Sequence, residues 1–178
     1  MGGVTWTIRP EPIDSPEAVA ALRAYAAELE SRRRGRPATE QEIAAALAEH
    51  PGHGLVPPDG HLLLARTEAD GTVAGCAAVL MIARATAEIR GVWVAPAARR
   101  GGLGGLLVAA AECAALGMGA RAVRSDTRRD LVEAERLYAR RGYVEIEPFD
   151  DSPYAHHRLG KPLRPTLTRI PPQASSPE

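Results

Sequence analysis

The chain has 178 residues, of which 45% are hydrophobic, and its 22 basic and 22 acidic side chains give a formal net charge of zero. This length fits one domain with a substantial core. The balanced charge offers no field that would attract nucleic acid or an acidic membrane surface. No apolar stretch approaches the roughly 18 residues that span a bilayer, and no signal sequence is recognisable. We therefore expect a cytoplasmic protein with no nucleic-acid or membrane partner.

The first third of the chain predicts one strand and two helices. Residues 5–9 alternate like a strand,. Ser15 followed by Pro16 is typical of a helix start, and positive charge in the run 32–36 suits the end of that helix. Residues 39–49 predict a second helix that begins with a Thr/Glu capping box. The basic run is interpreted as a solvated helix end, with an anion-binding role as the alternative.

Three strands follow, with a glycine-rich segment after the last of them. Residues 61–67 and 72–82 are apolar and β-rich, and the Asp-Gly pair between them indicates a hairpin,. Residues 87–94 form the next predicted strand. The segment 99–105 reads RRGGLGG and precedes an apolar helix predicted for 106–120. A glycine loop before a helix exposes backbone N–H groups at the positive end of the helix dipole, which is a favourable place for a phosphate.

The spacing of this loop narrows the choice of phosphate ligand. A P-loop needs Gly-Lys-Ser/Thr, which the chain lacks, and the dinucleotide fingerprint needs a glycine where Leu107 stands,. The pattern Arg99-x-x-Gly102-x-Gly104 resembles the pyrophosphate loop of the GNAT superfamily of acyl-CoA-dependent N-acyltransferases. The resemblance implies that acetyl-CoA is the cosubstrate and that its pyrophosphate contacts seven residues: Arg99, Arg100, Gly101, Gly102, Leu103, Gly104 and Gly105.

A second motif lies downstream. Residues 120–127 predict a strand, Asp130 is a candidate helix N-cap, and the helix is expected to end at Gly142,. The pattern Ala134-x-x-Leu137-Tyr138-x-x-x-Gly142-Tyr143 resembles the second GNAT signature. Strands are predicted for 143–146 and 154–159.

The order of the predicted elements indicates an α/β structure with a mixed sheet. The resemblance covers about residues 4–163 and implies a GNAT fold, with a mixed, mostly antiparallel sheet, splayed central strands and helices on both faces. Acyl-CoA would lie between the strands at 87–94 and 120–127. We expect one acetyltransferase domain over 1–163 and a disordered tail over 164–178.

Two residues are predicted to be catalytic. The resemblance places Tyr138 near the sulfur of CoA, where a protonated phenol can donate to the departing thiolate. Glu88 is the candidate general base, because a strand glutamate at this spacing deprotonates the amine in some histone-acetylating members. Core packing is the alternative for Tyr138, and a salt-bridged surface position is the alternative for Glu88. His156 and His157 are further candidate bases, with a structural or substrate-contact role as the alternative. His50, His53 and His61 flank the loop on the predicted acceptor side. Candidate polar or aromatic contacts for the acceptor are Tyr25, Glu28, Tyr143, Phe149 and Tyr154.

The remaining predicted contacts with acetyl-CoA involve the two central strands. The resemblance implies main-chain contacts from Val92, Trp93 and Val94, whose side chains could equally be core. Many family members hydrogen-bond the pantetheine through an asparagine, but this chain has none. Thr127 is the predicted substitute, with Arg128 or a backbone group as the alternatives.

The predicted activity is transfer of an acetyl group from acetyl-CoA to the primary amine of a small-molecule or amino-acid-like acceptor. Acetylation of a protein N-terminus or lysine is an alternative, and a non-catalytic CoA-binding sensor is an alternative of another class. The two cysteines, Cys76 and Cys113, match neither a disulfide framework nor a metal motif, so no metal is expected,. Both are expected to be buried. A homodimer remains open.

Overall fold

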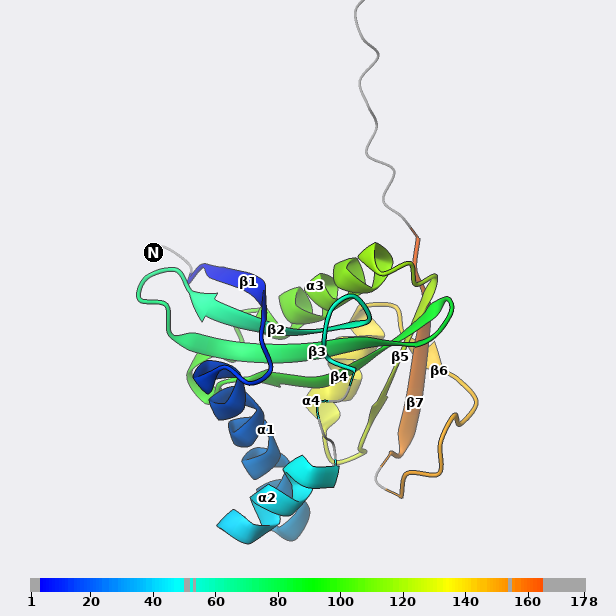
Figure 1. Cartoon of the computed structure of the whole chain (residues 1–178). Coiled ribbons are helices and arrows are strands. Elements are labelled where there is room, and N and C mark those ends of the chain that lie inside the picture. The colour runs from blue at the N-terminus through cyan, green and yellow to red at the C-terminus, as the bar shows by residue number, and fades with distance from the viewer. Residues whose placement is uncertain (1–3, 50–51, 53, 154, 165–178) are drawn as a thin grey trace, which may run out of the picture.

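The computed structural model describes residues 4–49, 52, 54–153 and 155–164. In this part of the chain, one seven-stranded sheet has the order β1-β2-β3-β4-β5-β7-β6 and lies between two layers of helices (Figure 1). The strands are β1 (Trp6–Glu11), β2 (Gly60–Thr67), β3 (Val73–Ala83), β4 (Thr86–Val94), β5 (Ala122–Thr127), β6 (Val144–Glu145) and β7 (His157–Pro162). The helices are α1 (Pro16–Arg34), α2 (Glu40–Glu49), the short 3-10 helix η1 (Pro96–Ala98), α3 (Leu103–Gly117) and α4 (Val132–Arg140).

The sheet is antiparallel except at its centre, where β4 and β5 run parallel. The β4–β5 ladder is short, because only Thr86, Ala87 and Glu88 of β4 have partners on β5. β5 is then fully paired on its other side with β7. The predicted mixed, mostly antiparallel α/β sheet is therefore confirmed.

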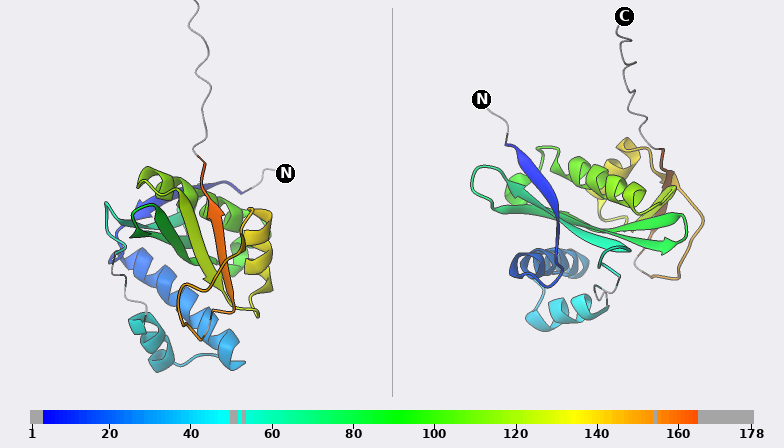
Figure 2. Two further views of the ribbon diagram at one scale, coloured as in Figure 1. Left: turned by 90° about the vertical axis from the view of Figure 1, so that its right-hand side faces the viewer. Right: turned by 45° about the horizontal axis from the view of Figure 1, so that its top comes forward.

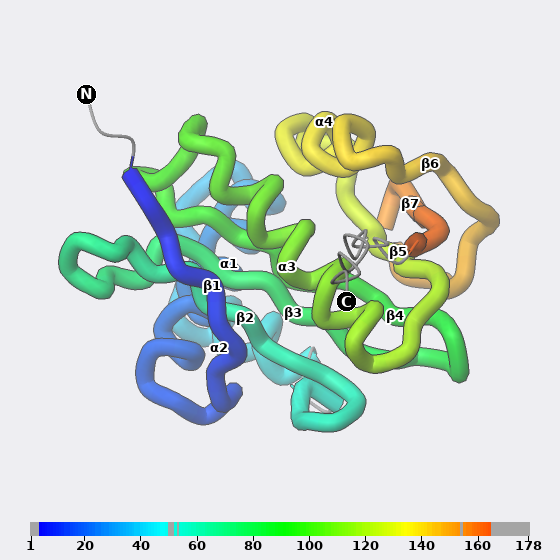
Figure 3. The backbone as a smooth tube through the Cα atoms, turned by 90° about the horizontal axis from the view of Figure 1, so that it is seen from above, coloured from blue at the N-terminus to red at the C-terminus, as the bar shows by residue number. Residues whose placement is uncertain are grey.

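Each face of the sheet packs against its own helices, as the two turned views show (Figure 2). The face towards α1 has a core of alanine, leucine and cysteine side chains, including Ala18 and Cys76. The opposite face packs against α3 and α4, whose buried residues include Val108 and Tyr138. Seen from above, α3 crosses the middle of the sheet and α4 lies near β5 and β7 (Figure 3).

The capping signals in the N-terminal third are confirmed. The Ser15 hydroxyl accepts a hydrogen bond from the Ala18 N–H at 3.1 Å. The capping box closes in both directions, with Thr39 N–H on the Glu42 carboxylate at 2.8 Å and Glu42 N–H on the Thr39 hydroxyl at 3.3 Å. Arg36 pairs with the same carboxylate at 2.7 Å, which holds the pKa of Glu42 near 2. The basic run therefore joins α1 to α2.

Several predicted boundaries are wrong. α3 begins at Leu103 rather than residue 106, because the buried Leu103 side chain anchors its first turn in the core. Asp130 does not cap α4, since its carboxylate pairs with Arg128 instead. The last strand starts at His157, where pairing with β5 sets its register. Cys113, expected to be buried, is exposed. The predicted tail lies outside the described residues apart from Arg164.

In the described part of the chain, no helix is both long enough and apolar enough to cross a membrane.

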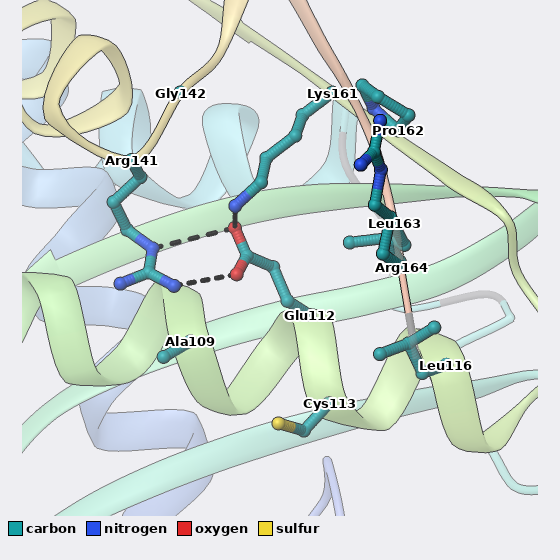
Figure 4. A pocket seen from close by; sticks show the side chains of 10 residues that line it. All are labelled: Ala109, Glu112, Cys113, Leu116, Arg141, Gly142, Lys161, Pro162, Leu163 and Arg164. Atoms are coloured by element: carbon teal, nitrogen blue, oxygen red, sulfur yellow. Dashed lines mark hydrogen bonds and ion pairs between the residues drawn. The ribbon is translucent and has the colours of Figure 1, made fainter. Parts of the chain in front are cut away.

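A buried acid connects α3, α4 and β7. The Glu112 carboxylate of α3 is paired with Arg141 at 2.7 Å and with Lys161 at 3.0 Å. Burial alone would raise the pKa of Glu112, but the hydrogen bonds from the two cations outweigh it and lower that pKa. This cluster lies at a pocket of about 530 Å³, and Figure 4 shows both cations directed at the carboxylate.

We expect Glu112→Gln to lower the stability at pH 7 by about 2 kcal/mol, because two partly buried cations lose their counter-charge. The melting temperature should fall by roughly 4–8 °C in a chain of this size. The native pKa of Glu112 is depressed, so its contribution is present above its unfolded value of 4.5 and is lost as the pH falls through the native pKa,. The gap between wild type and variant should therefore narrow at pH 4.

Glu135→Gln is the matched control, because Glu135 is exposed on α4. Equal melting temperatures for Glu112→Gln and Glu135→Gln at pH 7 would contradict this account of the cluster.

Candidate active site

The candidate site begins where β4 and β5 stop pairing. Their last partners are Glu88 and Arg124. Immediately beyond them, the Ser125 hydroxyl donates to the Ile89 carbonyl at 2.9 Å. The Ser125 side chain thus takes the place of the next backbone hydrogen bond between β4 and β5. We call residues 89–94 of β4 and 125–127 of β5 the strand fork.

The β4 arm of the strand fork is kinked by a β-bulge. The β3–β4 register shifts between Cys76 and Ala78, and Gly91 has φ of 58°. This left-handed conformation suits glycine, and bulges commonly redirect backbone groups next to functional sites. This β-bulge directly precedes Val92, Trp93 and Val94, the residues predicted to present main-chain groups to a thioester.

Tyr138 reaches the strand fork from α4. Its hydroxyl lies 2.9 Å from the Ser125 hydroxyl. Because Ser125 has one proton and donates it to the Ile89 carbonyl, Tyr138 donates to Ser125,. Burial raises the pKa of Tyr138 to about 12, so its phenol is protonated at neutral pH. The structure thus brings Tyr138 to the fork.

A second tyrosine, Tyr25, approaches the fork from α1 on the opposite face. A Cβ atom placed on Gly91 would lie 3.7 Å from the Tyr25 ring, so this ring covers the β-bulge. Burial raises the pKa of the Tyr25 phenol, and the neighbouring Tyr138 and Asp126 raise it further. Two protonated phenols from two helices therefore flank the fork.

The predicted phosphate-binding loop leads into the first turn of α3. Gly102 precedes this helix with φ of 85°, and a Cβ there would meet no atom within 4 Å. The N–H groups of Gly102, Leu103 and Gly104 have no hydrogen-bond partner in the described part of the chain, as expected in a first helical turn. Gly101 is needed for packing, since a Cβ there would lie 2.7 Å from the Trp6 ring.

The two arginines of the loop differ. The Arg99 guanidinium donates to the Val94 carbonyl at 3.0 Å and to Glu28 at 2.5 Å. The Trp93 indole donates to the same Glu28 carboxylate at 3.0 Å. Arg99 therefore fixes the loop to α1 and to the end of β4. Arg100 is exposed and adopts a positive φ of 65°.

The residues of β4 and β5 that were predicted to contact acetyl-CoA lie at the strand fork. The side chains of Val92 and Val94 are partly buried and pack against the core beneath α3. Thr127 ends β5, and its buried hydroxyl has no hydrogen-bond partner in the described part of the chain. A buried hydroxyl without a partner is costly, so the end of β5 has an unfilled hydrogen-bonding position.

Glu88 lies on the face towards α1 and is 4% exposed. One carboxylate oxygen accepts a hydrogen bond from Arg90 and the other accepts one from Arg124 at 2.6 Å. The Arg124 guanidinium stacks on Phe149, 3.8 Å from the ring centroid. Both oxygens of the predicted base are thus occupied by guanidinium groups.

The other candidates are dispersed. His157 pairs with Glu145 at 2.6 Å, and His156 accepts a long hydrogen bond of 3.5 Å from the Arg129 N–H. Tyr143 packs edge-on against Tyr138 in the core, away from α1. His61 lines a pocket on the α3 side of the sheet. Three candidates lie outside the described residues: His50, His53 and Tyr154. No group of three metal-binding side chains occurs in the described part of the chain.

Sequence reasoning missed Ser125 and Asp126. Ser125 bridges the fork, and Asp126 follows it on the face towards Tyr25. A signal was present, because Arg124-Ser-Asp126 and Glu88-Ile-Arg90 place charges at alternate positions of two strands predicted to be neighbours.

Comparison with known proteins identifies the family of the chain. The model of the acetyltransferase (GNAT) family matches residues 22–143. No curated protein matches the sequence significantly.

Several solved structures share the fold. An acetyltransferase of the GNAT family from Staphylococcus aureus is 13% identical, with a TM-score of 0.71 over 90% of this chain and 100% of that one. A GNAT acetyltransferase from Elizabethkingia anophelis with acetyl-CoA bound is 18% identical, with a TM-score of 0.59 and coverage of 89% and 98%. Spermidine N-acetyltransferase from Vibrio cholerae, in complex with CoA and spermine, is 15% identical, with a TM-score of 0.61 and coverage of 88% and 95%. Since the family model spans more than half of the chain, this protein belongs to the GNAT acetyltransferase family.

Proposed function

We propose that the protein transfers an acetyl group from acetyl-CoA to the primary amine of a small-molecule or amino-acid-like acceptor. The observation that carries this proposal is the protonated Tyr138 hydroxyl at the strand fork. It provides a buried proton donor at the point where the family implies that the thioester lies.

The residues of the fork and the glycine loop fit acetyl-CoA. The first turn of α3 has free N–H groups beside Gly102, where no side chain fills the space, and such N–H groups suit a pyrophosphate. The unpartnered Thr127 hydroxyl suits a pantetheine amide. Bound acetyl-CoA would supply the activated acetyl group, and the chain has to position it and manage the protons.

Three roles follow for the chain. Tyr138 donates its proton to the departing thiolate. Backbone N–H groups near Val92, Trp93 and Val94 polarise the carbonyl and stabilise the developing oxyanion. Glu88 as the base that deprotonates the amine stays a prediction, and its two guanidinium partners do not favour it.

A small acceptor is also consistent with the spermidine N-acetyltransferase that shares the fold. Acetylation of a protein N-terminus or lysine is the second enzymatic candidate. A CoA-binding sensor would retain the loop but would have no use for a proton donor at the fork.

The proposal is tested by acetyl-CoA turnover against a panel of free amino acids, polyamines and peptides, followed through release of the CoA thiol. We expect acceptor-dependent turnover that adds the mass of one acetyl group to a free amine. Acetyl-CoA at about 100 times its dissociation constant should stabilise the fold by about 2.7 kcal/mol, visible as a higher melting temperature. Thermal stabilisation without turnover of any amine would favour the sensor, and turnover of peptides alone would favour the protein acetyltransferase.

A further inference from the structure

A pair of opposite charges lies just past the end of the β4–β5 ladder. The ladder ends at Glu88 and Arg124. Side chains alternate along a strand, so Arg90 and Asp126, each two residues further on, lie on the same face, towards α1. They are the first pair on this face at which the two strands are no longer bonded to each other.

The Asp126 carboxylate has no cationic partner within the described residues. The residue is exposed, and it makes no hydrogen bond or ion pair within the described residues. Although the residue as a whole is exposed, its carboxyl group is partly desolvated by the surrounding protein, which raises the pKa of Asp126. Repulsion from Glu88 and Asp150 raises this pKa further, against a smaller opposite effect of Arg90 and Arg158. An added cation would relieve this repulsion.

The cation nearest in register does not neutralise Asp126. Arg158 is its direct partner on β7. The Arg158 guanidinium, however, donates to Asp150 at 2.8 Å and to the backbone of the segment that precedes β7. The negative charge of Asp126 also raises the pKa of two phenols, that of Tyr25 on the same face and that of Tyr138 on the opposite face.

Arg90 has spare hydrogen-bonding capacity. Its Nε atom is engaged by Glu88, and its side chain is 45% exposed. Its two terminal nitrogens donate no hydrogen bond within the described residues. Glu88 carries one negative charge between two guanidinium groups, so the trio of Glu88, Arg90 and Arg124 keeps a net positive charge. A guanidinium whose two terminal NH₂ groups are free, while its Nε is held by Glu88, is suited to bind a carboxylate,.

We propose that Asp126 and Arg90 bind the two ends of the acceptor, so that the acceptor is an amino-acid-like amine that also carries an acidic group. Asp126 receives the ammonium and accepts its proton, and Arg90 binds the acidic group. This inference rests on the proposed function and names its acceptor class. Glu88 then acts as a positioning residue that orients both arginines.

The proton balance of the reaction is complete with these residues. Asp126 accepts one proton from the ammonium, which frees the lone pair that forms the C–N bond. As the C–S bond breaks, Tyr138 donates its proton to the thiolate sulfur. The nitrogen loses its second proton as the amide forms, and this proton restores the Tyr138 phenol. The Asp126 proton leaves to solvent, so one proton is released for each acetyl group transferred.

The acceptor class is tested with matched pairs, each an amino acid and its carboxamide. We expect the wild type to prefer the acid, with a ratio of kcat/KM on the order of 10- to 100-fold. Arg90→Gln should bring this ratio close to one, mainly through the acceptor KM. Differences in the intrinsic reactivity of the two amines cancel when the ratio for Arg90→Gln is divided by the ratio for the wild type, because the same pair is measured with both enzymes. Arg84→Gln, in the exposed hairpin between β3 and β4, is the control that should keep the wild-type ratio.

The role of Asp126 is tested by the pH profile. Asp126→Asn should lower kcat/KM by about 10²-fold or more and remove the acidic limb assigned to this carboxylate, while the KM for acetyl-CoA stays the same. Asp126→Glu should restore part of the rate. Glu88→Gln should raise the acceptor KM but keep the acidic limb. Asp151→Asn, a nearby exposed acid, is the control and should match the wild type.

Failure of this inference is distinguishable from failure of the proposed function. A wild type that acetylates no amine at all contradicts the function itself. Turnover of amines with equal kcat/KM for acids and carboxamides overturns the acceptor class. Loss of the acidic limb in Glu88→Gln, with the limb retained in Asp126→Asn, overturns the assignment of Asp126 and returns the base role to Glu88.

Discussion

Tyr138→Phe should lower kcat by about 10²- to 10⁴-fold, which is the usual contribution of a positioned general acid. The phenyl ring keeps the packing of a side chain that is 4% exposed, so the KM for acetyl-CoA and the melting temperature should change little. Only the hydroxyl at the strand fork is lost. Steady-state kinetics with saturating amine and a thermal melt measure both quantities.

Tyr143→Phe is the matched control for this experiment. The Tyr143 ring packs edge-on against Tyr138, with 4.9 Å between centroids, and its hydroxyl lies towards Glu112 rather than at the strand fork. This variant should therefore keep kcat. If Tyr138→Phe turns over as fast as Tyr143→Phe, Tyr138 is a packing residue and the thiolate is protonated by another group.

Gly102→Asp should raise the KM for acetyl-CoA by about 10- to 100-fold. The new side chain would project into open space at the start of α3. Its carboxylate can cap the free N–H groups of the first turn and repel a pyrophosphate from them. Capping partly offsets the strain of φ at 85°, so binding should suffer more than stability. Arg100→Ala, which removes one exposed charge, should raise this KM by less than about fivefold.

Gly119→Asp is the control that separates the effect of backbone strain on stability from the effect of the new side chain on acetyl-CoA binding. Gly119 has φ of 95°, and a Cβ there also meets no atom within 4 Å. It follows the other end of α3, which at 15 residues is about 22 Å long,. This variant should lose a similar amount of stability and keep the wild-type KM. A Gly102→Asp enzyme with unchanged KM would show that the pyrophosphate does not bind at this turn.

Local chemistry explains which parts of the fold were predictable from the sequence. The start of α2 was predicted because both halves of its capping box, Thr39 and Glu42, lie within one helical turn. The last strand was predicted at 154–159, but its bounds as β7 were not, because its register depends on pairing with β5, at least thirty residues earlier in the chain. Asp130 also looked like a cap, but Arg128, two residues away, takes its carboxylate.

The same distinction holds for the candidate site. Tyr138 and the glycine loop were predicted because they belong to compact motifs of the sequence. The contact between Glu88 and Arg124 was not predicted. Arg124 is 36 residues away in the sequence and reaches Glu88 only through the parallel pairing of the central strands. The environment of Asp126 likewise combines groups from α1, α4, β4 and β7, which no local pattern contains.

The ion cluster around Glu112 has a practical consequence for such experiments. Lys161 is the chain's single lysine, and its ammonium pairs with Glu112 at 3.0 Å and lies 5.6 Å from the Tyr143 ring centroid. An ammonium in such a pair offers no lone pair to an electrophile. The catalyst thus has no free side-chain amine to compete for its own acetyl donor, so self-modification contributes little background when weak acceptors are screened. Immobilisation through lysine would disturb this cluster.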